Sequence, residues 1–196
     1  MFFDKKKYLV EYYTHHIGEN NHIIHIIFLS SIIWAIAGLL SLFGTIVDTP
    51  DWLVPFLMFV PEFQLDINLG TVFIFLNYFA IFIMDPIVGF VFFPPIFMQL
   101  ILIQLINQNF SLKSCIIRYV CTLLVSITAN LIGHKYVDQT QPAIFERKYK
   151  LIPFYHFFSV YTFFMYIGYR PFLYQDIKDE ANLRVAAMRK EQALNS

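Results

Sequence analysis

Long stretches without a charged side chain dominate the sequence. Between Glu19 and Asp48 there is no Asp, Glu, Lys or Arg, and the part from Ile23 to Val47 is apolar almost throughout. A helix that crosses a bilayer needs about 20 predominantly apolar residues, because its backbone polar groups must be satisfied within the segment. The pattern therefore predicts a membrane-spanning helix over 23–47.

Three further charge-poor segments follow, over residues 67–84, 87–112 and 114–133. The middle one is interrupted by Pro94-Pro95. The last carries a single charge, Arg118, near its start, where a long side chain reaches the membrane interface. The sequence Asp-Pro-Ile-Val-Gly that separates the first two is typical of a tight turn. We therefore expect a helical hairpin around Asp85 to Gly89.

Shorter segments complete the predicted architecture. The stretch 153–169 is rich in Tyr and Phe, and it either spans at a tilt or lies in the interface as an aromatic belt does. The stretch 51–63 is interrupted by prolines and is expected at the interface. From about residue 172 the chain reads as a solvated amphipathic tail. We predict an all-α polytopic membrane bundle of about four to five membrane-embedded helices. It forms a single membrane-embedded domain over 1–196, with a short polar amino-terminal segment.

Composition supports the same interpretation. Of 196 residues, 58% are hydrophobic and only 14% are charged, which is far more apolar than a soluble domain. The formal net charge is zero, so there is no overall basic field to hold nucleic acid. The sequence predicts an integral membrane protein in contact with lipid and excludes a nucleic-acid partner.

The distribution of basic residues predicts the orientation. Three lysines, at positions 5 to 7, precede the first span, and further basic residues gather between Lys135 and Lys150. Both regions are expected in the cytosol, and the four predicted crossings between them agree with that placement. The tail after Tyr169 is also basic, which conflicts with a complete fifth crossing.

Six histidines carry the candidate chemistry, and four of them lie within eleven residues: His15, His16, His22 and His25. Gly18 and the two asparagines that follow favour a helix break, with a new helix starting near Asn20 or Asn21. Such a kink would let His16 fold back beside His25.

A second candidate segment lies at the far end of the fourth span. Asn130, His134 and Asp138 are spaced i, i+4 and i+8, which places them on one face of an α-helix. The number of predicted membrane crossings places this face on the same side of the membrane as His16 and His25. The three histidines can then form one transition-metal site, with Asp138 or Asn130 as a further ligand or as the group that orients a ring.

A simpler interpretation remains open for every histidine. Histidines near membrane ends often hydrogen-bond only to headgroups or to neighbouring helices. This interpretation is favoured for His15, His22 and His156, whereas ionisable groups in membrane segments are otherwise candidates for function.

The order and spacing of these residues resemble a known family. The pattern Tyr12-x3-His16-x4-Asn21-x3-His25, followed by Gly133-His134-x3-Asp138-x3-Pro142-Ala143, is similar to the small membrane proteins of the yeast 2-hydroxy fatty acid dioxygenase family. The likeness extends to the exit from the last apolar segment, Gly168-Tyr-Arg-Pro171. Asp138 stands where members of the family have Glu.

This resemblance implies an iron(II)-dependent dioxygenase of fatty acid α-oxidation. Such an enzyme uses O2 to shorten a long-chain 2-hydroxy fatty acid by one carbon, with release of carbon dioxide, as in phytosphingosine degradation. It implies that Fe2+ is held by His16, His25 and His134, with Asp138 also in the catalytic set. The host membrane is then the endoplasmic reticulum, or the inner membrane if the source is bacterial. No further cofactor is expected, and no Gly-rich nucleotide loop occurs.

Three alternatives compete with this function. Di-iron membrane hydroxylases need about eight histidines in boxes such as His-x-x-His-His, and this chain has six without that box. A non-catalytic lipid-binding or structural membrane protein and a bis-histidine haem protein stay open. Metal analysis would distinguish the lipid-binding or structural protein from the dioxygenase, and a Soret band would identify the haem protein.

Overall fold

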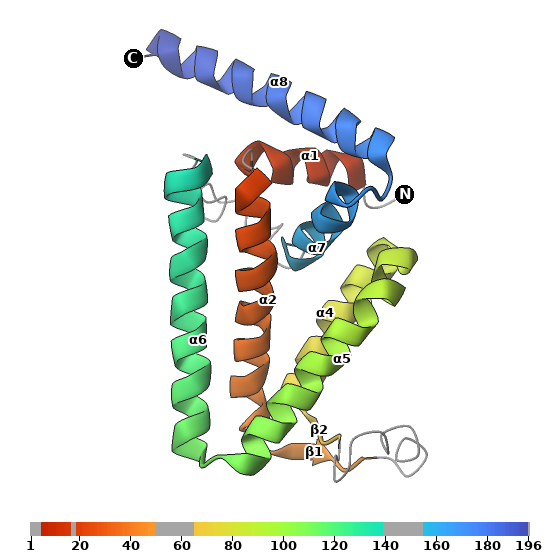
Figure 1. The fold of residues 1–196 in the computed structure, drawn as a ribbon, viewed down its shortest axis with the longest axis vertical. Coiled ribbons are helices and arrows are strands. Elements are labelled where there is room, and N and C mark those ends of the chain that lie inside the picture. The colour runs from red at the N-terminus through yellow and green to blue at the C-terminus, as the bar shows by residue number, and fades with distance from the viewer. Residues whose placement is uncertain (1–4, 17–18, 50–64, 139–154, 196) are drawn as a thin grey trace. The chain divides into compact units, whose positions relative to one another are not determined.

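The computed structural model describes residues 5–16, 19–49, 65–138 and 155–195, and within them the regular structure is almost entirely helical (Figure 1). The α-helices in these ranges are α1 (Lys5–His15), α2 (Glu19–Ser41), α4 (Leu69–Met84), α5 (Pro86–Asn109), α6 (Leu112–Ile132), α7 (Tyr155–Tyr166) and α8 (Pro171–Asn195). A π-helix, η1 (Gly133–Asp138), continues α6. Two short strands, β1 (Thr45–Val47) and β2 (Ile67–Asn68), pair antiparallel. The predicted all-α class is confirmed.

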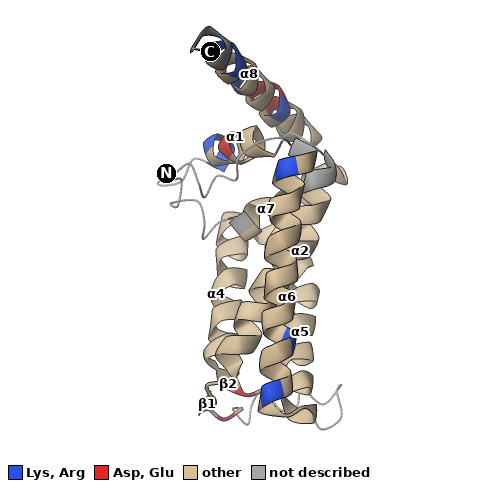
Figure 2. Ribbon diagram, turned by 90° about the vertical axis from the view of Figure 1, so that its left-hand side faces the viewer, with Lys and Arg blue, Asp and Glu red and all other residues tan. Residues whose placement is uncertain are grey.

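Three of the described helices are long and apolar enough to cross a membrane. Candidate spans cover His22–Ser41 in α2, Pro86–Asn109 in α5 and Leu112–Tyr136 in α6 and η1, with mean hydropathies of 2.4, 2.1 and 1.8. The apolar helix α4 has 16 residues and is shorter. Charged residues line α1 and α8, whereas α4 and α5 have none (Figure 2). These features indicate an integral membrane protein.

Two details of the predicted spans differ from the structure. The first span ends at Ser41 and not at Val47, because the chain turns at Gly44, whose φ of 97° suits glycine, and then enters β1. Pro94 and Pro95 do not interrupt the third segment, since α5 runs through both. Membrane helices tolerate such prolines because neighbouring groups satisfy the backbone carbonyls that lose their donors.

The predicted hairpin between the second and third segments is present, with a turn tighter than expected. Asp85 alone separates α4 from α5, and its backbone N–H donates to the Ile81 carbonyl, 3.0 Å away. Its carboxylate caps α5 by accepting from the Val88 N–H at 3.4 Å, and Pro86 occupies the first helical position. One residue therefore reverses the chain, and the rest of the expected turn belongs to α5.

The chain divides into two compact units, and the boundaries between them fall inside α2 and α6. One unit combines Met1–Leu29 with Thr128–Ser196, and the other is Ser30–Ile127. We call them the terminal unit and the central unit.

In the central unit, small residues and a polar network hold the helices together. A Cβ at Gly70 of α4 would meet the Ala37 carbonyl oxygen of α2, so the two backbones pack closely there. Asn107 of α5 donates to the Ser41 hydroxyl at 2.7 Å and accepts from the Tyr119 hydroxyl at 2.9 Å. This network joins α2, α5 and α6.

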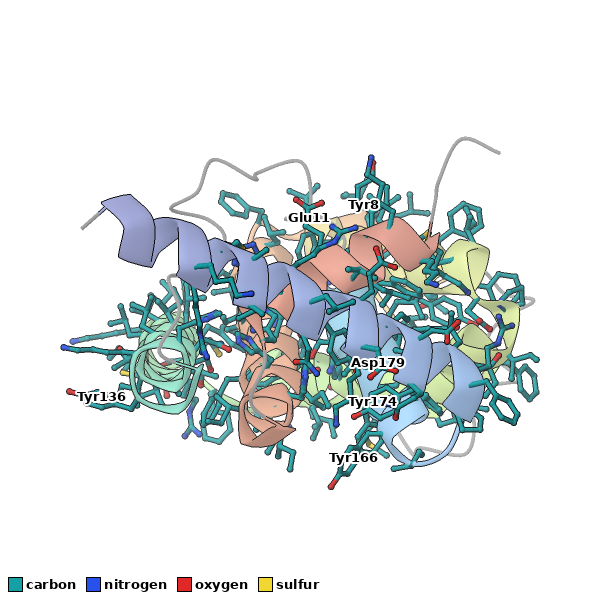
Figure 3. All side chains as sticks on the ribbon, turned by 90° about the horizontal axis from the view of Figure 1, so that it is seen from above. Tyr8, Glu11, Tyr136, Tyr166, Tyr174 and Asp179 are labelled. Atoms are coloured by element: carbon teal, nitrogen blue, oxygen red, sulfur yellow. The ribbon has the colours of Figure 1, made fainter. Side chains whose placement is uncertain are left out.

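In the terminal unit, α8 packs along α1, and α7 packs on both (Figure 1). The Nζ atom of Lys6 in α1 lies 3.7 Å from Oδ2 of Asp176 and 3.8 Å from Oε2 of Glu180, both in α8. Viewed from above, Tyr174 and Asp179 project from α8 and Tyr8 and Glu11 from α1 (Figure 3). Buried side chains of all three helices form the core: Leu9, Val10, Phe157, Phe158, Tyr161 and Ile177.

Helix α7 has 12 residues, or about 18 Å at 1.5 Å per residue. That length is well short of the roughly 30 Å hydrocarbon core of a bilayer. Of the two alternatives for 153–169, the described part therefore fits a packed or interfacial helix, which removes the conflict with the basic tail. The segment 51–63 and the residues from 139 to 154 lie outside the described part of the structure.

Candidate metal centre

Three buried imidazoles meet in the terminal unit. His16, His25 and His134 each offer a ring nitrogen, and these atoms all lie within 4.8 Å of one another. The ring centroids of His16 and His25 are 4.3 Å apart, and each lies 4.8 Å from the centroid of His134. The structure thus brings together the three histidines that were candidates for one metal site.

The three rings come from segments with different backbone geometry. His25 lies in α2, and His134 is the second residue of η1. His16 follows the last residue of α1, and its N–H donates to the Tyr13 carbonyl at 3.1 Å. The break between α1 and α2 confirms the predicted helix interruption, which allows His16 to lie beside His25.

The backbone around His134 differs from the prediction. We expected one α-helical face through Asn130, His134 and Asp138, but the α-helix ends at Ile132 and η1 begins at Gly133. A π-helix uses i→i+5 hydrogen bonds, so the expected α-helical geometry is wrong from Gly133 onward. The placement of Asp138 on the face of Asn130 and His134 stays a prediction. Single-turn π-helices occur frequently at functional sites.

Burial makes the three imidazoles suitable as metal ligands. Only 2%, 7% and 6% of His16, His25 and His134 are exposed. Burial, together with the neighbouring His134, His22 and His15, holds the pKa of His16 well below its usual 6.5, so the ring stays neutral with a lone pair available. Nε2 of His25 is buried and has no hydrogen-bond partner among the described residues. A bound cation would satisfy this atom.

The spacing of the nitrogens fits one ion after a small movement. Two imidazole nitrogens that each lie about 2.1 Å from a shared ion are about 3.0 to 3.4 Å apart. The separations of up to 4.8 Å are therefore wider than those of a loaded site. Binding would shorten the widest separation by up to about 1.4 to 1.8 Å, a shift that rotation of the side chains can supply.

Aromatic side chains surround the cluster. The Tyr12 ring lies 4.3 Å from His16, centroid to centroid, and 5.7 Å from Phe158 of α7. The ring centroid of His22 lies 4.8 Å from that of Tyr13 and 6.2 Å from that of His16. Tyr12 belongs to the sequence pattern that resembles the family, but the pattern assigns it no role. Its position four residues before His16, at the end of a helix, is the signal that could have identified the contact.

The remaining candidates have different surroundings. His15, His22 and His156 are buried, with 3%, 7% and 5% of each exposed, and lie outside the group of three. Burial lowers the pKa of His156 to about 4. Asp138 ends η1, and its side chain lies outside the described part of the structure. Its catalytic role stays a prediction.

The arrangement permits a specific kind of chemistry. Three neutral nitrogen ligands suit a first-row transition metal and leave further coordination positions to other molecules. Because the cluster is buried, few water molecules compete for those positions. Such a site can bind both a chelating substrate and a small gas.

Comparison with known proteins adds an independent finding. A family model described as 2-hydroxy-palmitic acid dioxygenase Mpo1-like matches residues 2–170, which include all three histidines of the cluster. Neither the curated proteins nor the solved structures contain a match to the chain.

Proposed function

This chain belongs to the Mpo1-like 2-hydroxy-palmitic acid dioxygenase family, and from that premise we propose that it is an iron(II)-dependent dioxygenase of long-chain 2-hydroxy fatty acids. The product is the fatty acid that is one carbon shorter. The observation that carries the proposal is the buried group of His16, His25 and His134 inside the matched region.

The overall reaction balances without an added reductant. A 2-hydroxy acid and O2 give the shortened acid, carbon dioxide and water. The bond between the carboxyl carbon and the hydroxyl-bearing carbon breaks, and oxidation of the substrate supplies all four electrons that reduce O2. Neither a 2-oxoacid nor a flavin is therefore needed.

In this proposal the protein's residues hold the iron, orient the substrate and limit the access of water. His16, His25 and His134 would hold the iron, and the orphaned Nε2 of His25 fits such a ligand role. Bound iron(II) supplies the activation of O2. The three imidazoles leave positions for the substrate's carboxylate and hydroxyl and for O2. Burial of the cluster limits side reactions with water.

Two further assignments belong to the proposal. Asp138, close to His134 in sequence, would orient a ligand ring or a substrate group through its carboxylate, as the family's Glu would. The substrate's acyl chain comes from the bilayer that the apolar helices occupy. The host membrane is the endoplasmic reticulum, or the inner membrane of a bacterial source.

Product analysis with purified protein tests the proposed function. Protein in lipid nanodiscs is loaded with iron(II) and given 2-hydroxypalmitate carrying a label in the alkyl chain, in air and without oxygen. We expect the labelled acid that is one carbon shorter only in air. His134→Ala should abolish its formation, because one ligand is lost.

The matched control is His156→Gln, which alters an equally buried histidine outside the cluster and should retain turnover. If the loaded wild type forms no shortened acid, the function is wrong. If His134→Ala works at the wild-type rate, the ligand assignment is wrong. A non-catalytic lipid-binding protein would give the first of these results.

A further inference from the structure

The three histidines of the cluster differ in how firmly the backbone fixes them. His25 lies inside α2, and His134 lies inside η1. His16 lies just beyond α1, in neither helix, with its N–H bonded to the Tyr13 carbonyl. The orientation of the His16 ring therefore depends on side-chain packing more than the orientation of the other two does.

Among the residues that the structure describes, Tyr12 supplies the closest ring contact to His16 from outside the cluster. Their centroids are 4.3 Å apart with the planes tilted by 47°, whereas the His22 ring is 6.2 Å from that of His16. Tyr12 lies on the last turn of α1, four residues before His16, where a side chain reaches the residue one turn later.

Tyr12 is itself firmly held. It is 1% exposed, and its ring is 5.7 Å from Phe158 of α7 and 6.1 Å from Tyr13, edge to face. A ring enclosed in this way has few alternative rotamers, so it can limit the motion of the imidazole that it touches.

We propose that Tyr12 is a positioning residue that fixes the His16 imidazole in the orientation needed to bind the metal. This inference rests on the proposed metal centre. The aromatic ring carries the effect, because it is the ring that lies against the imidazole. A leucine at this position leaves space beside His16, so the imidazole must lose rotational freedom when it binds an ion.

Titration with Co(II) tests the inference without any measurement of turnover. Co(II) takes imidazole ligands, and its visible absorption reports the number and geometry of the groups bound. The full chain in nanodiscs is stripped with a chelator and titrated with Co(II) alone. The proteins compared are the wild type, Tyr12→Phe, Tyr12→Leu and His16→Ala, which shows the spectrum without the third imidazole.

The matched control is Tyr161→Leu. Tyr161 is fully buried in α7 of the same unit, with ring contacts to Phe157 and Tyr169 and with Lys5 above its face, and it does not belong to the histidine cluster. The same loss of volume should therefore destabilise the terminal unit without altering the Co(II) site. Circular dichroism and thermal unfolding report folding for every variant.

We expect Tyr12→Leu to bind Co(II) about 10-fold more weakly, as is typical when a group that orients a ligand is removed. Its spectrum should shift toward that of His16→Ala. Tyr12→Phe and Tyr161→Leu should match the wild type in affinity and spectrum.

Three results would overturn the inference while leaving the metal centre in place. These are wild-type binding by Tyr12→Leu, weakened binding by Tyr12→Phe, and equal weakening by Tyr161→Leu, which would reflect general loosening of the unit. A wild type that takes up no Co(II) would overturn the metal centre and the inference together.

Discussion

The hydrogen bond between Tyr119 and Asn107 should contribute measurably to the stability of the central unit. The Tyr119 hydroxyl donates to Oδ1 of Asn107 at 2.9 Å, and the Ile103 carbonyl lies 3.3 Å from it. Tyr119 is fully buried, and Asn107 also donates to Ser41 at 2.7 Å. Tyr119→Phe removes the hydroxyl without changing the volume of the ring.

The expected magnitude follows from this geometry. Interhelical hydrogen bonds in membrane proteins contribute about 0.6 kcal/mol on average and up to about 1.7 kcal/mol. Because Tyr119→Phe leaves a part-buried amide oxygen without its donor, we expect a cost of about 1 kcal/mol. Asn107→Leu loses the bonds to both Tyr119 and Ser41 and should cost about 2 kcal/mol.

A double-mutant cycle isolates the shared bond. Unfolding free energies are measured in micelles by denaturation with a strong detergent for the wild type, both single variants and the double variant. The double variant should be less destabilised than the sum of the singles by about 0.5 to 1 kcal/mol. Tyr166→Phe, on a half-exposed tyrosine of α7, is the control and should be neutral. Additivity of the two single effects within about 0.3 kcal/mol would refute the reasoning.

Three further predictions concern packing, pH and topology. Gly70→Val should destabilise the central unit by about 1 to 3 kcal/mol in the same assay, because its side chain would press on the Ala37 carbonyl; an unchanged free energy would contradict the close packing. The pKa of His156 falls from 6.5 to about 4 on burial, so the unfolded chain takes up this proton at a higher pH than the folded chain does. The contribution of neutral His156 to folding stability is therefore fully present above pH 6.5 and is lost as the pH falls toward 4. In metal-free protein, His156→Gln should remove up to about 3 kcal/mol of that acid dependence, and identical pH profiles would contradict the assignment. Cysteines introduced at Lys7 and Lys148 should react with an impermeant label from the same side of the membrane, and labelling from opposite sides would break the predicted topology.

The elements that could be predicted from sequence are those set by local physics. A charge-poor, apolar stretch of about 20 residues has few stable states other than a membrane helix, so the approximate positions of α2, α5 and α6 follow from the hydrophobic pattern. The break before α2 was predictable from Gly18 and the asparagines that follow it, since these residues favour helix ends.

The details that could not be predicted depend on tertiary contacts. The change to a π-helix at Gly133 has no signal in the residue pattern, because i→i+4 and i→i+5 bonding suit the same residues and the surrounding structure selects between them. The one-residue turn at Asp85 depends on its carboxylate reaching the Val88 N–H. Likewise, the spacing suggests that Tyr12 faces His16, but only the packing of α7 shows that Tyr12 is held in place.

The central claim is that His16, His25 and His134 together hold one iron. X-ray absorption at the iron edge of the anaerobically loaded protein counts imidazole ligands directly, because each ring adds a characteristic scattering from its outer atoms. We expect about three imidazoles, with nitrogens at about 2.0 to 2.2 Å, and one fewer in His25→Ala. A wild-type spectrum with fewer than two imidazoles, or one that His25→Ala leaves unchanged, would contradict the claim.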